Sequence, residues 1–139
     1  MDAKVTWQGN LTFEGTANSG FKVPLGTEPE VGGNNDGFKP MELLLTGLAG
    51  CTAMDVISIL KKKKQDVTGF EVKAHADRKS DHPRVFTHVV LEYIVTGHHV
   101  DMVALERAIE LSETKYCPAQ AMLKMAVTID HKVILLEAA

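Results

Sequence analysis

The sequence has only two cysteines, Cys51 and Cys117, and they form no Cys-x-x-Cys motif. A disulfide scaffold needs more cysteines than this, and a cysteine-based zinc site needs closely spaced ones. The N-terminus also lacks the basic-then-apolar pattern of a secretion signal. We therefore expect a cytoplasmic protein in which both thiols are reduced.

Clustered positive charge is scarce too, because the formal net charge is −3 at pH 7. Nucleic-acid binding rests on clustered basic residues, so we expect no nucleic-acid partner. The one basic run, Lys61 to Lys64, closes a helical pattern, where cations are favourable. The uncharged stretch from Leu43 to Met54 is shorter than the roughly 20 apolar residues that cross a bilayer. We expect no membrane partner.

Motifs for bound cofactors and metals are missing as well. The sequence contains no GxGxxG, P-loop or GxSxG pattern. Its six histidines include no HxxxH or HxH spacing, and only His75 and His88, on neighbouring predicted strands, could meet. One such pair is little for a metal ion, so we expect neither a metal nor an organic cofactor.

The hydrophobic pattern predicts an α+β fold with a mainly antiparallel sheet, in one domain that covers residues 1–139. With 45% apolar residues the chain can bury a core. Alternating residues predict strands, and a period of 3.6 residues predicts helices. The predicted strands are residues 3–8, 11–16, 21–25, 70–77, 85–95 and 127–136; the predicted helices are residues 40–63, about 101–115, and one beginning at residue 118; residues 26–39 are predicted to be loop.

The helix over residues 40–63 is unusually apolar. Between residues 41 and 60 only Glu42 and Asp55 are charged, and apolar side chains surround the whole circumference. Such a helix is expected to be buried on all sides. One small domain can hardly bury it alone, whereas a dimer that packs two copies together could.

The two thiols occupy different helical positions. Cys117 precedes Pro118 at a helix start, where free N–H groups lower the pKa of a thiol. Cys51 lies in mid-helix, and an ionised Asp55, four residues on, would disfavour its thiolate, so activation needs a cation from elsewhere. Taken alone, either cysteine is more often a small buried hydrophobe than a nucleophile.

Glu42 lies nine residues before Cys51. On one helix this spacing puts the two about 13.5 Å apart along the axis and about 180° apart around it. Glu42 therefore either complements the helix dipole or approaches Cys51 from a second copy of the helix.

Two segments of the sequence carry a family resemblance. They are Pro40-Met41-Glu42-Leu43-Leu44-Leu45 through Ala49-Gly50-Cys51-Thr52-Ala53-Met54-Asp55-Val56, and Tyr116-Cys117-Pro118 through Ala121-Met122-Leu123. Together they resemble the OsmC/Ohr family, and the match in element order runs nearly end to end. The resemblance implies an OsmC-like fold with a curved sheet, and an intertwined homodimer with two long helices back to back and active sites at the subunit interface. It implies no metal or organic cofactor.

The resemblance also implies an activity, the thiol-dependent reduction of organic hydroperoxides in oxidative or osmotic stress. By carry-over, Cys51 attacks the peroxide and becomes a sulfenic acid, and Cys117 condenses with it to a disulfide that an external dithiol reduces. The peroxidases have a Glu where this chain has Met41; Glu42 stands one position later, turned by about 100°.

The cation that the family places beside its thiolate is the second departure. The peroxidases use an Arg from the N-terminal strands, and this chain has no Arg before Arg78. Arg84, from the turn between two predicted strands, is the candidate replacement. The predicted catalytic set is therefore Cys51, Cys117, Glu42 and Arg84.

Two further interpretations remain open. The missing Arg and the shifted Glu favour a binding module without peroxidase activity, in which a dimer groove lined by Leu, Met and Ala side chains holds a small hydrophobic ligand. Alternatively, the protein is a structural dimer in which the cysteines only pack.

Overall fold

The computed structural model describes all 139 residues and divides the chain into two compact units. The first unit is Met1–Leu44 and the second is Leu45–Ala139. The boundary falls inside the long helix α1 (Pro40–Lys62). Each unit has its own sheet, so the two are described separately.

The first unit holds a three-stranded antiparallel sheet in the order β1-β2-β3. The tight turn after β1 needs left-handed backbone, which Gly9 and Asn10 supply with φ of 104° and 46°. The strands are β1 (Ala3–Gly9), β2 (Thr12–Ala17) and β3 (Lys22–Leu25). The predicted loop 26–39 also contains a short 3₁₀ turn, η1 (Pro29–Val31).

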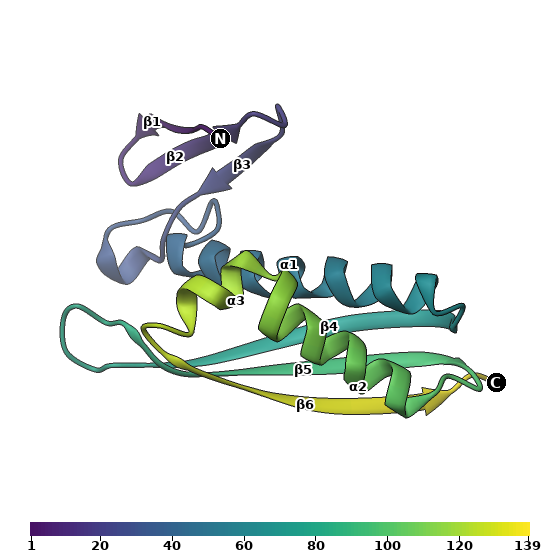
Figure 1. Cartoon of the computed structure of the whole chain (residues 1–139). Helices are drawn as coiled ribbons and strands as arrows, with labels where there is room; N and C mark the ends of the chain where they lie inside the picture. Colours follow the sequence, from purple (N-terminus) through teal and green to yellow (C-terminus); the bar gives the residue numbers. More distant parts are fainter. The chain divides into compact units, whose positions relative to one another are not determined.

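The second unit places its helices on a three-stranded sheet in the order β4-β5-β6 (Figure 1). β4 and β5 form the predicted hairpin, and β6 pairs with β5 in parallel. After α1, the elements are β4 (Asp66–Arg78), β5 (Phe86–His98), α2 (Met102–Leu111), the π-helical turn η2 (Ser112–Tyr116), α3 (Pro118–Leu123) and β6 (Thr128–Glu137).

The core of the second unit lies between this sheet and the helices. From Val89 to Gly97 every second residue of β5 is buried, as the alternating pattern predicts. One stripe of α1, spaced by four residues, packs onto the core. The buried residues of β5 include Val89, Leu91, Tyr93 and Val95, and those of α1 are Leu48, Thr52, Val56 and Leu60.

The expectation that α1 is buried on all sides is wrong for the single chain. Only the four-residue stripe is buried, and Met54 is 74% exposed. By length and composition alone, α1 is long and apolar enough to cross a membrane. The shorter uncharged stretch from Leu43 to Met54 had suggested the opposite. The stripe of α1 nevertheless packs on the sheet as a core helix does.

The α+β class, the two hairpins and the positions of α1 and α3 are confirmed. Asp101 caps α2 as predicted, because its side chain accepts a hydrogen bond from the Val103 N–H. The α-helical part ends at Leu111 and gives way to the π-turn, so the prediction of one helix to residue 115 is only partly right. The single domain, the curved sheet and the dimer stay predictions.

Candidate active site: the two thiols

Cys51 and Cys117 are neighbours in the second unit. Both are free thiols; Cys51 is half-buried and Cys117 is only 2% exposed. The Cys51 side chain is hydrogen-bonded to Cys117, and its proximity raises the pKa of the Cys117 thiol. The structure therefore brings together two thiols that come from different helices, α1 and the start of α3.

Cys117 occupies the predicted position at the N-cap of α3. Its Sγ accepts a hydrogen bond from the backbone N–H of Gln120 at 3.4 Å, and Pro118 follows as the first helical residue. This geometry by itself would lower the pKa of the thiol.

The predicted activation of Cys117 is nevertheless wrong in the single chain. Burial, the largest cause, and the neighbouring Cys51 together raise the pKa of the Cys117 thiol to about 11. The N–H groups of Gln120 and Ala119 act in the opposite direction but do not prevail. The free energy that a thiolate loses on leaving water exceeds what the N–H groups of one short helix supply. Cys117 is therefore a neutral thiol at neutral pH.

A buried polar cluster lies beside the thiols and centres on Thr52, the residue after Cys51. The Thr52 hydroxyl lies 2.7 Å from the Tyr93 hydroxyl and 2.8 Å from the Ser112 hydroxyl. It also accepts a hydrogen bond from Nε2 of Gln120 at 3.1 Å. All four side chains are buried, and they come from α1, β5, η2 and α3.

The cluster ends at a carboxylate. The Ser112 hydroxyl donates to Oδ2 of Asp55 at 3.0 Å. Burial raises the pKa of Tyr93 to about 12, although the hydrogen bonds with Thr52 and Gln120 lower it. Tyr93 is therefore a neutral hydrogen-bonding group. The Asp55 carboxylate, which we expected to disfavour a Cys51 thiolate, accepts a hydrogen bond from Ser112.

The sequence interpretation missed Thr52, Tyr93, Ser112 and Gln120. The available signal was a polar side chain at a core position: Thr52 interrupts the apolar stripe of α1, and Tyr93 stands in the buried register of β5. Buried polar groups are nearly always hydrogen-bonded, so such positions predict partners. The identity of the partners depends on the packing of distant elements.

Glu42 is placed at the start of α1, in the first unit. Its carboxylate accepts a hydrogen bond from the backbone N–H of Lys39 at 2.9 Å. A carboxylate that binds a free N–H at a helix start stabilises that start, which fits the dipole interpretation of this residue. Its predicted part in the site stays a prediction.

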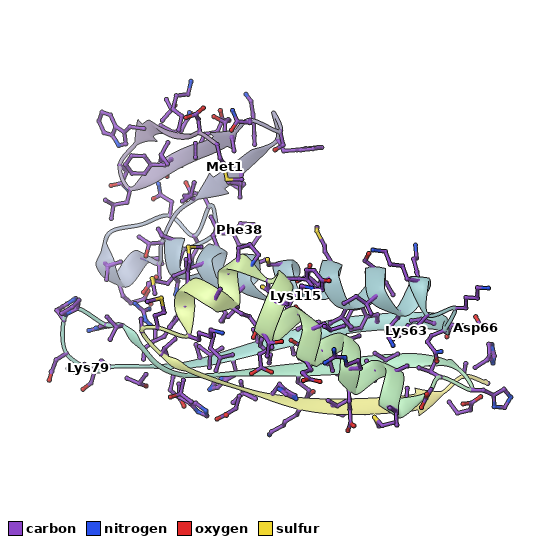
Figure 2. All side chains as sticks on the ribbon, in the orientation of Figure 1. Met1, Phe38, Lys63, Asp66, Lys79 and Lys115 are labelled. Atoms are coloured by element: carbon purple, nitrogen blue, oxygen red, sulfur yellow. The ribbon has the colours of Figure 1, made fainter.

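Arg84 lies exposed in the turn between β4 and β5. Its carbonyl accepts a hydrogen bond from Nε of Arg78 at 2.9 Å, and no hydrogen bond or ion pair joins its guanidinium to Cys51. Figure 2 shows Lys79 of the same turn at the opposite end of the second unit from Lys63, which follows α1. Within one chain, no hydrogen bond joins the Arg84 side chain to either thiol.

A hollow of about 430 Å³ opens beside the polar cluster in the second unit. Its wall includes Asp55, the end of the cluster, and Tyr116, the residue before Cys117. It is more polar than the predicted groove of Leu, Met and Ala side chains. The lining residues are Asp55, Ser58, Ile59, Lys62, Lys63, Leu111 and Tyr116.

The histidines that could meet across the β4–β5 hairpin pair with carboxylates instead. Nε2 of His75 lies 3.1 Å from Asp77, and Nε2 of His88 lies 2.6 Å from Asp130. No group of three or more potential metal ligands comes together in the structure.

The sequence model of the family described as OsmC-like protein matches residues 33–132. The chain belongs to the OsmC-like family. Protein YhfA of Escherichia coli (strain K12) is 42% identical over 134 residues, which are 94% of this chain and 95% of that protein.

Solved structures agree on the fold. An OsmC-like protein from Mycoplasma pneumoniae superposes with a TM-score of 0.82 at 17% identity, over 97% of this chain and 96% of its own. The organic hydroperoxide resistance protein OsmC from Legionella pneumophila superposes with a TM-score of 0.72 at 18% identity, over 96% of this chain and 95% of its own. At such identities the likeness concerns the fold alone.

Proposed function

We propose that this protein is a thiol-dependent peroxidase that reduces organic hydroperoxides in the response to oxidative or osmotic stress. The observation that carries the proposal is the pairing of two free cysteines, one half-buried and one buried, in a chain of the OsmC-like family. One structural relative, from Legionella pneumophila, is named as an organic hydroperoxide resistance protein. YhfA, the relative at 42% identity, has a name that indicates no activity.

The chemistry proceeds in three balanced steps. The Cys51 thiolate attacks the outer peroxide oxygen, the O–O bond breaks, and a proton completes the alcohol while Cys51 becomes a sulfenic acid. The Cys117 sulfur then attacks the Cys51 sulfur, its own proton leaves with the sulfenic hydroxyl as water, and a disulfide forms. An external dithiol reduces this disulfide and is itself oxidised to a disulfide.

The raised pKa of Cys117 argues against this residue as the one that attacks the peroxide first. A thiol with a pKa of about 11 is a poor attacker of peroxide, because the thiolate is the nucleophile. Cys51, which is half-buried and so reachable by a substrate, is the better candidate for the first attack.

The activating cation is proposed to come from a second copy of the chain. Arg84 is exposed and forms no hydrogen bond with Cys51 within its own chain, and we propose that it serves the thiolate of a partner in a homodimer. The outward side of α1 supports such pairing, because Met54 is exposed, and added Cβ atoms at Gly47 and Gly50 would meet nothing within 4 Å. Glu42 would reach the same interface site.

The activity is tested by adding cumene hydroperoxide to the reduced protein and counting free thiols. The wild type should lose two thiols per chain and gain the Cys51–Cys117 disulfide. Cys117→Ser should lose only Cys51, as a sulfenic acid that a dimedone probe traps. Cys51→Ser should react slowly or not at all. A wild type that keeps both thiols, with Cys51 unmodified by mass spectrometry, would refute the proposal.

The dimer is tested by a charge on the outward side of α1. Met54→Glu should convert a dimer to a monomer in analytical ultracentrifugation. Val103→Glu, on α2, is the matched control because Val103 is 71% exposed and Met54 is 74% exposed. A wild type that sediments as a monomer, or a Met54→Glu variant that remains dimeric, would contradict the pairing.

A binding module is the second candidate function. The first unit contains a mostly apolar hollow of about 430 Å³, within the range of small-molecule sites. Binding of a fluorescent hydrophobic probe by Cys51→Ser as tightly as by wild type, with thiols inert to hydroperoxide, would favour it. The hollow is lined by Val5, Leu11, Phe13, Leu25, Gly26, Thr27 and Pro40.

A further inference from the structure

Thr52 is the one polar residue in the buried stripe of α1. A hydroxyl in a core costs free energy unless it is hydrogen-bonded. This hydroxyl has three partners, Tyr93, Ser112 and Gln120, and no buried side-chain polar atom in the structure lacks a partner. Thr52 is therefore the only break in the apolar stripe, and it is the residue next to Cys51.

The hydrogen-bond directions in the cluster follow from the carboxylate at its end. Ser112 donates its single proton to Asp55, so Thr52 must be the donor to Ser112. The Thr52 oxygen is then an acceptor for Tyr93 and for Nε2 of Gln120. The side chain at position 52 must therefore both donate and accept hydrogen bonds, as a Thr or Ser hydroxyl does.

The two thiols are tied to each other through this hydroxyl. On one side, Cys51 is the covalent neighbour of Thr52. On the other side, Gln120 binds Thr52 with its side chain, and its backbone N–H binds the Cys117 sulfur. Gln120 is 3% exposed and belongs to α3, a helix of six residues. The Thr52–Gln120 bond thus attaches the first turn of α3 to α1 beside both sulfurs.

We propose that Thr52 is a positioning residue for the thiol pair, which sets the distance and orientation at which the Cys51 and Cys117 sulfurs meet. The proposal rests on the proposed function, in which these sulfurs form a disulfide. Holding two reacting groups together raises their effective concentration. Loss of the Thr52 hydroxyl therefore lowers the equilibrium constant for disulfide formation, even when both cysteines remain.

The experiment equilibrates the protein in mixtures of oxidised and reduced dithiothreitol and quantifies the Cys51–Cys117 disulfide by mass spectrometry. Thr52→Val keeps the shape and removes the hydroxyl. It should need about a tenfold higher ratio of oxidised to reduced reagent for half-oxidation, a shift of about 30 mV for a two-electron couple. Thr52→Ser restores the hydroxyl and should stay within about twofold of wild type.

Val56→Ala is the matched control for a merely structural effect. Val56 lies one turn further along the same buried stripe, and its apolar side chain forms no hydrogen bond with the polar cluster. It should lower the thermal unfolding midpoint and leave the disulfide equilibrium unchanged. Should Thr52→Val fail to fold, Gln120→Met serves instead, because it keeps the backbone N–H at Cys117 and removes the side-chain hydrogen bonds to Thr52 and Tyr93.

The proposal is overturned if Thr52→Val matches wild type, if Val56→Ala shifts the equilibrium as much as Thr52→Val, or if the wild type forms no Cys51–Cys117 disulfide at any ratio. The measurement contains no peroxide, so it separates the two proposals. A protein inert to cumene hydroperoxide that still shows the Thr52→Val shift refutes the peroxidase and leaves the positioning role standing.

Discussion

Raising the pH above 9 should destabilise this protein through the single buried thiol of Cys117. The unfolded chain releases the proton of this thiol near its ordinary pKa of 9.0, whereas burial and the neighbouring Cys51 raise the pKa of the folded thiol to about 11. Below pH 9 the thiol is neutral in both states and its full contribution to stability is present. Between pH 9 and 11 the unfolded state binds fewer protons than the folded state, so stability falls as the pH rises.

The size of the effect follows from the separation of the two pKa values. One pKa unit corresponds to about 1.4 kcal/mol, so the loss approaches roughly 2 to 3 kcal/mol by pH 11. Domains of this kind are stable by about 5–15 kcal/mol, so the change is readily measured. Tyr93, with its pKa raised to about 12, adds a loss of the same sign at higher pH.

The assay is urea unfolding of wild type and of Cys117→Ala at several pH values between 8 and 11. The difference in unfolding free energy between the two proteins reports the contribution of Cys117, which includes its effect on the pKa of Tyr93. The thiolate absorbance of Cys51→Ala gives a second measurement. In that variant the pKa of Cys117 should fall from the wild-type value and remain above 9, since burial is the largest cause of the shift.

Two results would refute this reasoning. One is a free-energy difference between wild type and Cys117→Ala that does not change from pH 8 to 11. The other is thiolate formation by Cys117 below pH 9, which would mean that the N–H groups at the start of α3 outweigh burial.

Three test substitutions, two of them with a matched control, probe the packing that holds the site. Gly97→Ala would drive a Cβ into the Asp66 carbonyl and should cost about 1–3 kcal/mol in urea unfolding, whereas Gly69→Ala, whose Cβ would meet Thr96 no closer than 3.6 Å, should cost less. Asp101→Ala should cost about 1 kcal/mol by loss of the α2 cap, and Asp101→Asn should restore most of it. Leu60→Ala, at a fully buried site, should cost roughly 2–5 kcal/mol; a loss well below 1 kcal/mol would show that the core closes over the cavity.

The elements were predictable because their signals are local. The alternation in β4 and β5, the cap at Asp101 and the proline at the first position of α1 each lie within a few residues of the structure they specify. The N-cap position of Cys117 was predictable for the same reason. Its pKa was not, because the burial that raises it depends on how α3 packs, which sequence spacing does not reveal.

The polar cluster was beyond prediction for a related reason. Thr52 and Gln120 are 68 residues apart in sequence, and their hydrogen bond exists only after α3 has packed against α1. The parallel pairing of β6 with β5 depends likewise on the crossover through the intervening helices. Composition and spacing identified both thiols, whereas the groups that hold them together were visible only in three dimensions.

The parallel pairing of β5 with β6 also has a consequence for synthesis on the ribosome. β4 and β5 can pair as soon as their hairpin emerges, whereas the other edge of β5 waits until residues 99–127 have followed and β6 appears. During that interval a nascent chain carries an unpaired strand edge, which is a template for association with other chains. Both cysteine segments are translated before that edge closes, so we expect chaperone binding to nascent chains to be strongest in this interval.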